Sequence, residues 1–446
     1  MHSIMHRPRG GTNATEDVPL VPPKTTVGSS GSETTTRRRL FARSCTSLIG
    51  PGMIVSLADT DAACLIVAAD SGARWGYSLL LLQLLLIPVL FMAQELTVRL
   101  GVHTRRGHTA CIKERFGRGW AWFTCGVLVL SCVGATVSEM SGVASVGELW
   151  GLGRVASTAA ASLVLVGVVV GGTYAQVEAV GIVLGLFECT FILTMIMARP
   201  SPLEVLEGLG TMHTDPGYLK LVAANIGAVI MPWMIYFQQS AIVAKGLTSP
   251  EAEAKERTDT LAGALLTQLI MISTLVTMAA TRGVTHTVAL RDVSEMAAAM
   301  SVMFGPFSGK VLLSLGLAGG SLCAAFVVAL AAAWGVCEAR QDFRPNSLDL
   351  PVREVPHFYG CYLAVVLLGA AILSSGADVV ELNTAVMLAD AMLMPVTLWF
   401  LFSLASGPEL PAEVRLRGWH KALCAVLFVV CSAFALGTSL LGLRSR

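Results

Sequence analysis

Two carboxylates, Asp59 and Asp61, stand near the middle of an otherwise apolar stretch that runs from Gly50 to Leu65. A charge at the centre of a bilayer costs at least about 2.5 kcal/mol, so acids at that depth mark a place where a partner compensates them. On a regular helix, residues two positions apart point to different faces. One site that uses both carboxylates therefore predicts local unwinding of this segment. The alternative is that one Asp is protonated or is solvated at the edge of a cavity.

A second stretch in which the helix is expected to be interrupted lies between Gly227 and Pro232. Proline cannot donate a backbone hydrogen bond, and its ring clashes with the preceding helical turn. In transporters built from two inverted repeats, interrupted helices at corresponding positions of the two halves point to the binding site. The alternative is an ordinary packed kink at Met231 and Pro232. Because the two stretches fall in the first and sixth predicted spans, we expect them to form one site.

The elements that position these residues are membrane helices. Of the 446 residues, 54% are hydrophobic and 14% are charged, against about 25% charged in soluble domains. A net charge of +1 gives no reason to expect nucleic acid as a partner. Apolar runs of about twenty residues, without the alternation of a β-barrel, predict an all-α integral membrane protein with eleven transmembrane helices. The predicted spans are 48–70, 77–100, 120–142, 157–173, 177–198, 218–241, 261–281, 309–335, 358–375, 380–404 and 419–441.

The chain divides into three predicted parts. Residues 1–44 are polar and rich in Thr, Ser, Pro and Gly, which predicts a disordered cytoplasmic tail. Residues 45–404 form the core, with repeats at about 45–198 and 218–404. A loop and the eleventh helix occupy 405–446. Lys and Arg are roughly twice as common on one set of flanks, which predicts a cytoplasmic N-terminus and a C-terminus on the opposite side.

Other polar residues at membrane depth are candidates for the site or its gates. For each alone, a packing hydrogen bond between helices is at least as expected as a role in transport. All eight His residues lie outside the central spans, so a His relay across the membrane is not expected. The acids are Glu95, Glu139, Glu178, Glu188 and Asp390, and the amides are Gln94, Gln238, Gln268 and Asn383.

Residues 45–405 resemble the NRAMP family of proton-coupled metal importers. The likeness is carried by Gly50-Pro51-Gly52 leading to Asp61, by the Gly227 to Pro232 stretch, by Ser138-Glu139, and by the basic loop between Leu100-Gly101 and Phe116-Gly117. The resemblance implies a LeuT-type fold of two inverted five-helix repeats. It also implies that a divalent metal ion, as transported substrate, binds between broken helices one and six.

The resemblance assigns roles to individual residues. Asp61 matches the Asp of the family motif Asp-Pro-Gly-Asn, and Met231 matches the Met of the family motif Met-Pro-His. We therefore expect Asp61 to be the central ligand, assisted by backbone carbonyls near Ala58 and Ala228, with Met231 lining the cavity. Asp59 adds a second charge beside these groups.

The sequence departs from the family at four places. Cys64 replaces the Asn ligand, Trp233 replaces the helix-six His, and Thr136 replaces an acid three residues before Glu139. The ninth predicted span, 358–375, has no basic residue. The departures resemble those of NRAMP-related magnesium transporters, a subgroup that carries hydrated ions. They interrupt the family's proton route, so we expect transport without obligatory proton coupling.

The metal is the least constrained expectation. Sulfur ligands such as Met231 and Cys64 suit Mn²⁺ or Fe²⁺, whereas carboxylates and retained waters suit Mg²⁺. We place Mg²⁺ slightly ahead. The alternatives are a proton-coupled Mn²⁺/Fe²⁺ symporter, an organic-solute carrier on the same fold, whose anionic substrate two aspartates would repel, and a channel. No nucleophile–base pair indicates an enzyme, and we expect no cofactor; the expected partners are divalent metal ions and the lipid bilayer.

Overall fold

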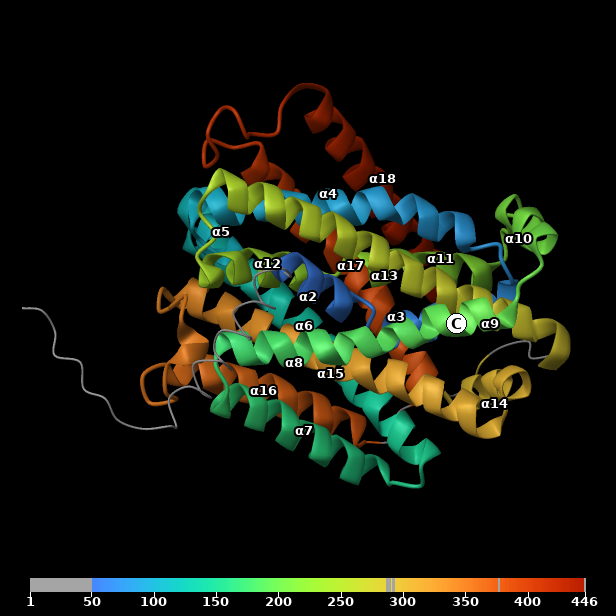
Figure 1. Cartoon of the computed structure of the whole chain (residues 1–446). Helices are drawn as coiled ribbons and strands as arrows, with labels where there is room; N and C mark the ends of the chain where they lie inside the picture. The colour runs from blue at the N-terminus through green and yellow to red at the C-terminus, as the bar shows by residue number, and fades with distance from the viewer. Residues whose placement is uncertain (1–49, 286–289, 291–292, 376–377, 445–446) are drawn as a thin grey trace, which may run out of the picture. The chain divides into compact units, whose positions relative to one another are not determined.

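The computed structural model describes residues 50–285, 290, 293–375 and 378–444 (Figure 1). The predicted tail, residues 1–44, lies outside them. Regular structure in the described residues is α-helical, with two short 3₁₀ segments and no strand. The predicted all-α class is therefore confirmed.

The apolar helices reproduce the predicted set of spans. Within the described part of the chain, ten helices are long and apolar enough to cross a bilayer, and a bent pair near the N-terminus makes eleven. In chain order they are α2 (Pro51–Asp59) with α3 (Ala62–Trp75), α4 (Leu80–Thr104), α6 (Arg118–Leu149), α7 (Arg154–Gly171), α8 (Tyr174–Leu186) continued by η1 (Phe187–Cys189) and α9 (Thr190–Ala198), α11 (Pro216–Val229) with α12 (Pro232–Lys245), α13 (Pro250–Thr285), α15 (Pro306–Arg340), α16 (Pro356–Leu373), α17 (Val379–Ala405) and α18 (Gly418–Arg444).

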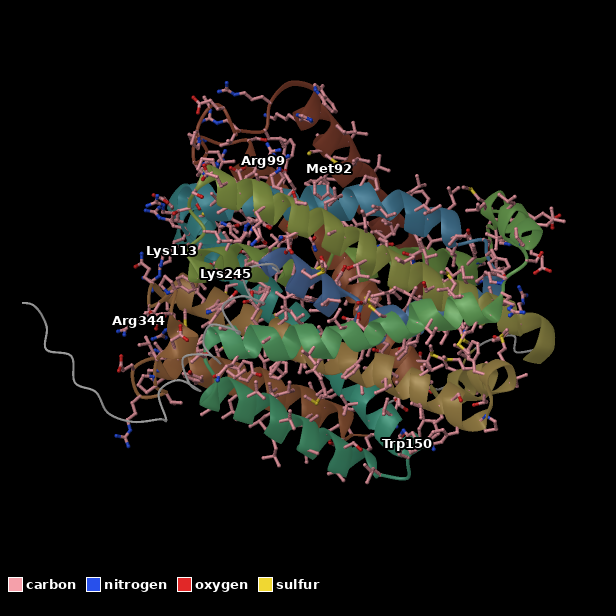
Figure 2. All side chains as sticks on the ribbon, viewed as in Figure 1. Met92, Arg99, Lys113, Trp150, Lys245 and Arg344 are labelled. Carbon is pink, nitrogen blue, oxygen red and sulfur yellow. The ribbon has the colours of Figure 1, made fainter. Side chains whose placement is uncertain are left out.

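Short helices close the two ends of the bundle. They are α5 (His108–Phe116), α10 (Pro202–Leu209), α14 (Val293–Phe304) and the 3₁₀ segment η2 (Ser347–Asp349). Figure 1 shows α5 at one end, and α10 and α14 at the other. Figure 2 shows Lys113, Lys245 and Arg344 at the α5 end, and Trp150 at the end near α14. Basic side chains that the sequence assigns to inner flanks thus share one end of the bundle.

The first span is broken at Thr60, as predicted. Helices α2 and α3 meet at an angle of 49°. Thr60 leaves the helical region (φ −84°, ψ 50°), and Asp61 is extended (φ −70°, ψ 177°). The Asp61 side chain then accepts a hydrogen bond of 2.8 Å from the backbone N–H of Cys64. Because Asp is among the best N-cap residues, the same carboxylate that marks the break also starts the next helix.

The sixth span is broken one residue before its proline. Ile230 (φ −132°, ψ 83°) and Met231 (φ −88°, ψ 142°) separate α11 from α12, which begins at Pro232. A residue that precedes proline is pushed out of the helical region, and proline itself suits the first helical position. This break therefore follows from one local residue choice.

Burial places the second break at the centre of the bundle. The apolar part of Pro216–Lys245 is 89% buried, against 22% for that of α18. Figure 1 shows α18 and α7 at opposite margins, with α2 and α3 between them. The broken helices therefore lie inside the bundle, while α18 presents most of its surface outward.

Candidate metal-binding site

The two breaks face each other directly. The Cys64 thiol, in the first turn of α3, donates to the carbonyl oxygen of Ala228, near the end of α11, at 3.2 Å. Ala58 occupies the last turn of α2, and both Ala58 and Ala228 are buried. The last carbonyls of a helix have no partner within it, so two helix ends bring acceptor oxygens to one place. This contact brings Cys64 and Ala228, which the sequence assigned to one site, together across the two breaks.

Four carboxyl groups surround the first break. They come from Asp59, Asp61, Glu139 on α6 and Glu188 on η1, and none is more than 1% exposed. Glu139 accepts a hydrogen bond of 3.2 Å from the N–H of Ala62. Asp61 lies close enough to Glu139 and Glu188 to interact with both electrostatically. Four acids from three spans therefore concentrate negative charge where α2 ends and α3 begins.

Several oxygens of these acids have no hydrogen-bond partner among the described residues. They are both oxygens of Asp59 and one each of Asp61, Glu139 and Glu188. A buried, unpartnered carboxylate oxygen is costly, and a bound cation removes that cost. No three His, Cys, Asp or Glu side chains of the described residues are arranged so that they alone could hold a metal ion. A cation at the break would therefore combine few carboxylates with backbone oxygens.

The two sulfur atoms of the candidate site are engaged by other groups. Met231 accepts a hydrogen bond of 3.3 Å at Sδ from the indole N–H of Trp233. Cys64 donates its thiol proton to Ala228, as described above. Trp233 itself is fully buried beside the break. In this conformation the atoms that are free to bind a metal ion are oxygens rather than sulfurs.

Two predicted polar candidates act in helix packing. The amide of Gln238 accepts from Thr97 at 2.7 Å and donates to Thr260 at 3.0 Å, joining α4, α12 and α13. The amide of Asn383 accepts from Ser138 and donates to Ser141 at 2.8 Å. Both side chains therefore take the helix-packing role, which the sequence left open as the alternative to a role in transport.

Thr136 and Asp390 make their hydrogen bonds to α6 rather than to the break. The Thr136 hydroxyl donates to the backbone carbonyl of Cys132 at 2.8 Å, within its own helix. One oxygen of Asp390 accepts from Ser131 at 2.6 Å, and the other has no partner among the described residues. Asp390 therefore joins α17 to α6 through a half-satisfied carboxyl group.

The sequence did not single out three contacts that hold α2 and the break after it. The hydroxyl of Thr60, inside the first break, donates to Glu188. In the first turn of α2, the N–H groups of Gly52 and Met53 donate to Glu256 and Asp259 of α13, each at 2.7 Å. Glu188 was visible as an acid at membrane depth, but no local pattern indicated which helix it would meet.

Comparisons with known proteins agree with this architecture. A family model described as natural resistance-associated macrophage protein-like matches residues 52–440. The divalent metal cation transporter MntH of Deinococcus radiodurans is 27% identical over 64% of this chain and 67% of its own length. Other curated relatives match over as little as 43% of their length.

Solved structures share the fold. A manganese transporter of Eremococcus coleocola superposes with a TM-score of 0.67 at 17% identity, over 92% of this chain and 88% of that one. The inward-facing structure of Mhp1 superposes with a TM-score of 0.52 at 14% identity, over 89% of this chain and 90% of that one. At these identities the likeness concerns the fold alone.

The helices and their two central breaks define an integral, multi-pass membrane protein with the LeuT-type transporter fold. Within that class, the chain belongs to the Nramp (natural resistance-associated macrophage protein-like) family, as its resemblance implied.

Proposed function

We propose that the protein is a membrane transporter that imports divalent metal cations, bound as substrate between the α2–α3 and α11–α12 breaks. One observation carries the proposal: Asp59 and Asp61 lie fully buried at a helix break, with oxygens that lack partners among the described residues. A cation supplies the missing compensation, whereas an anionic organic substrate would add repulsion. The names of the relatives, a divalent metal cation transporter and a manganese transporter, support the same class.

Within this class we place Mg²⁺ first and Mn²⁺ or Fe²⁺ next. Hard cations prefer oxygen ligands, and Mg²⁺ retains several waters of its own. The partnerless atoms around the break are carboxylate oxygens, while the sulfurs of Met231 and Cys64 are held by Trp233 and Ala228. Mn²⁺ remains the direct competitor because it accepts oxygen ligands as well.

We further propose that import does not require proton symport. A coupled carrier needs titratable groups that link the metal site to the other side. Trp233 stands where the family has its helix-six His, and the Thr136 hydroxyl donates to the backbone carbonyl of Cys132. Asp390 accepts a hydrogen bond from Ser131, and among the described residues no hydrogen bond joins it to the acids of the break. The membrane potential alone supplies about 4.6 kcal/mol per 100 mV for a divalent ion.

The orientation of the chain is part of the proposal. The end that carries Lys113, Lys245 and Arg344 is assigned to the cytoplasm by the positive-inside rule. At that end Lys245 pairs with Glu178 of α8 at 2.8 Å, and Glu256 holds the first turn of α2. These contacts join α8 to α12 and α2 to α13 on the cytoplasmic side of the buried acids. Their release would open the site towards the cytoplasm.

The test is uptake into liposomes that contain the purified protein and a pH-sensitive dye. Mg²⁺, Mn²⁺ and Ca²⁺ are compared at a clamped membrane potential, with protein-free liposomes as the blank. The proposal expects saturable uptake of Mg²⁺ and Mn²⁺ without matching internal acidification. Absence of uptake of every divalent ion would overturn the function, and acidification in proportion to uptake would overturn the uncoupled mechanism.

A further inference from the structure

Glu188 occupies an irregular point of the fifth span. Helix α8 ends at Leu186, the 3₁₀ turn η1 covers Phe187–Cys189, and α9 continues from Thr190. Glu188 is fully buried. It accepts a hydrogen bond from the hydroxyl of Thr60, which lies 128 residues earlier in the break between α2 and α3. The fifth span is thus hydrogen-bonded, through Glu188, to the unwound part of the first span.

The second oxygen of Glu188 faces another acceptor. An ideal Cβ placed on Gly320 of α15 would lie 2.7 Å from Glu188 Oε1 and 2.9 Å from the carbonyl oxygen of Thr60. Both oxygens therefore approach the same side of Gly320, which is possible because residue 320 has no side chain. Oε1 has no hydrogen-bond partner among the described residues.

Two buried acceptors on the same side of Gly320 repel each other unless a cation or a proton lies between them. The chemistry of the atoms present suits a cation. Asp61 and Asp59 act electrostatically on Glu188, and a cation beside it would offset the repulsion among these carboxyl groups. The available atoms are a carboxylate, a backbone carbonyl and a hydroxyl oxygen, which are the ligands of hard cations.

We propose that Glu188 and Thr60, beside Gly320, form a second position for the transported divalent cation, separate from the position between the two helix breaks. The inference rests on the proposed function, since the cation is the one that the protein carries. Two adjacent weak positions let an ion leave the central site without passing through an interior that lacks ligands. This is the general requirement for conduction through a multi-site path.

The test counts bound Mn²⁺ on the intact, detergent-solubilised protein by the loss of the free-ion electron paramagnetic resonance signal. The wild type is expected to bind two ions per chain. Asp61→Asn and Glu188→Gln should each bind one, and the double variant should bind none over the same concentration range. Gln keeps the acceptor for Thr60 and can donate to its carbonyl, as a protonated Glu would. A merely structural or protonated Glu188 therefore predicts equal binding by Glu188→Gln and wild type, which would overturn the proposal.

A second variant crowds the same two oxygens without changing any charge. Gly320→Ala places a methyl group against Glu188 Oε1 and the Thr60 carbonyl, and it should also remove one of the two ions. The control is Thr194→Val on α9, a buried hydroxyl bonded to Thr277 at 3.1 Å, which should leave two. Wild-type protein that binds one Mn²⁺ and transports it would refute only the second position. Wild-type protein that neither binds nor transports a divalent ion would refute the proposed function itself.

Discussion

Asp61 has two roles that its substitutions can separate. It caps α3 through the 2.8 Å bond to the N–H of Cys64, and it presents a second, partnerless oxygen beside Glu139. Asn retains the cap, because it ranks with Asp at this position, but it carries no charge. Ala removes both the cap and the charge. The pair of variants therefore distinguishes a ligand from a structural residue.

The expected magnitudes differ for the two roles. Losing an N-cap costs about 1 kcal/mol, so Asp61→Ala should be less stable than Asp61→Asn by that amount. Removing one partner of a buried charged pair costs about 3–5 kcal/mol. At about 1.4 kcal/mol per tenfold change, metal affinity should fall by roughly two to three and a half orders of magnitude in both variants. Uptake should be abolished in both while expression is retained.

The assay is calorimetric titration with Mn²⁺ and Mg²⁺, paired with thermal unfolding of each variant and liposome uptake. The matched control is Asp70→Asn on the same helix, because Asp70 pairs with the half-exposed Arg74 at 2.8 Å, outside the break. That control should bind metal as the wild type does. Metal affinity of Asp61→Asn within threefold of the wild type, or normal uptake by Asp61→Ala, would refute the assignment of Asp61 as the central ligand.

Three further outcomes follow from the structure. If the thioether reaches the ion, Met231→Ala should weaken Mn²⁺ binding more than Mg²⁺ binding. If the ion stays hydrated, the substitution should change neither affinity. Calorimetry that shows the larger loss for Mg²⁺ contradicts both versions. An inside-negative potential of 100 mV should accumulate the divalent ion by roughly three orders of magnitude, at about 4.6 kcal/mol, and no accumulation in radiotracer uptake would exclude a voltage-driven carrier. Burial lowers the pKa of His108 to about 4, so between pH 6.5 and 4 the unfolded chain binds a proton that the folded one does not, and stability falls as the pH falls. His108→Gln should flatten the decline in unfolding temperature between pH 7 and pH 5, which is worth about 2 kcal/mol; an unchanged slope would show that another group controls it.

The sequence alone determined the spans and the two breaks. Span lengths follow from the thickness of the bilayer, and the runs predicted at 48–70 and 218–241 became the α2–α3 and α11–α12 pairs. The breaks were readable because their causes are local. Pro232 displaces Met231 from the helix, and Asp61 offers its own cap to Cys64. Family motifs carried by the same residues allowed the fold to be named before any contact was known.

Only the tertiary structure decided which polar atoms at the site are free. The thiol of Cys64 stood in the sequence as a candidate ligand, and its partner, the carbonyl of Ala228, lies 164 residues away. In the sequence Glu188 is one acid among several, and only its packing against Gly320 and its hydrogen bond with Thr60 place it beside the break. Gln238 was an open candidate until Thr97 and Thr260 satisfied its amide. An apolar run specifies that a helix forms and spans the bilayer, but its rotation and depth are set by close packing against helices that are distant in sequence.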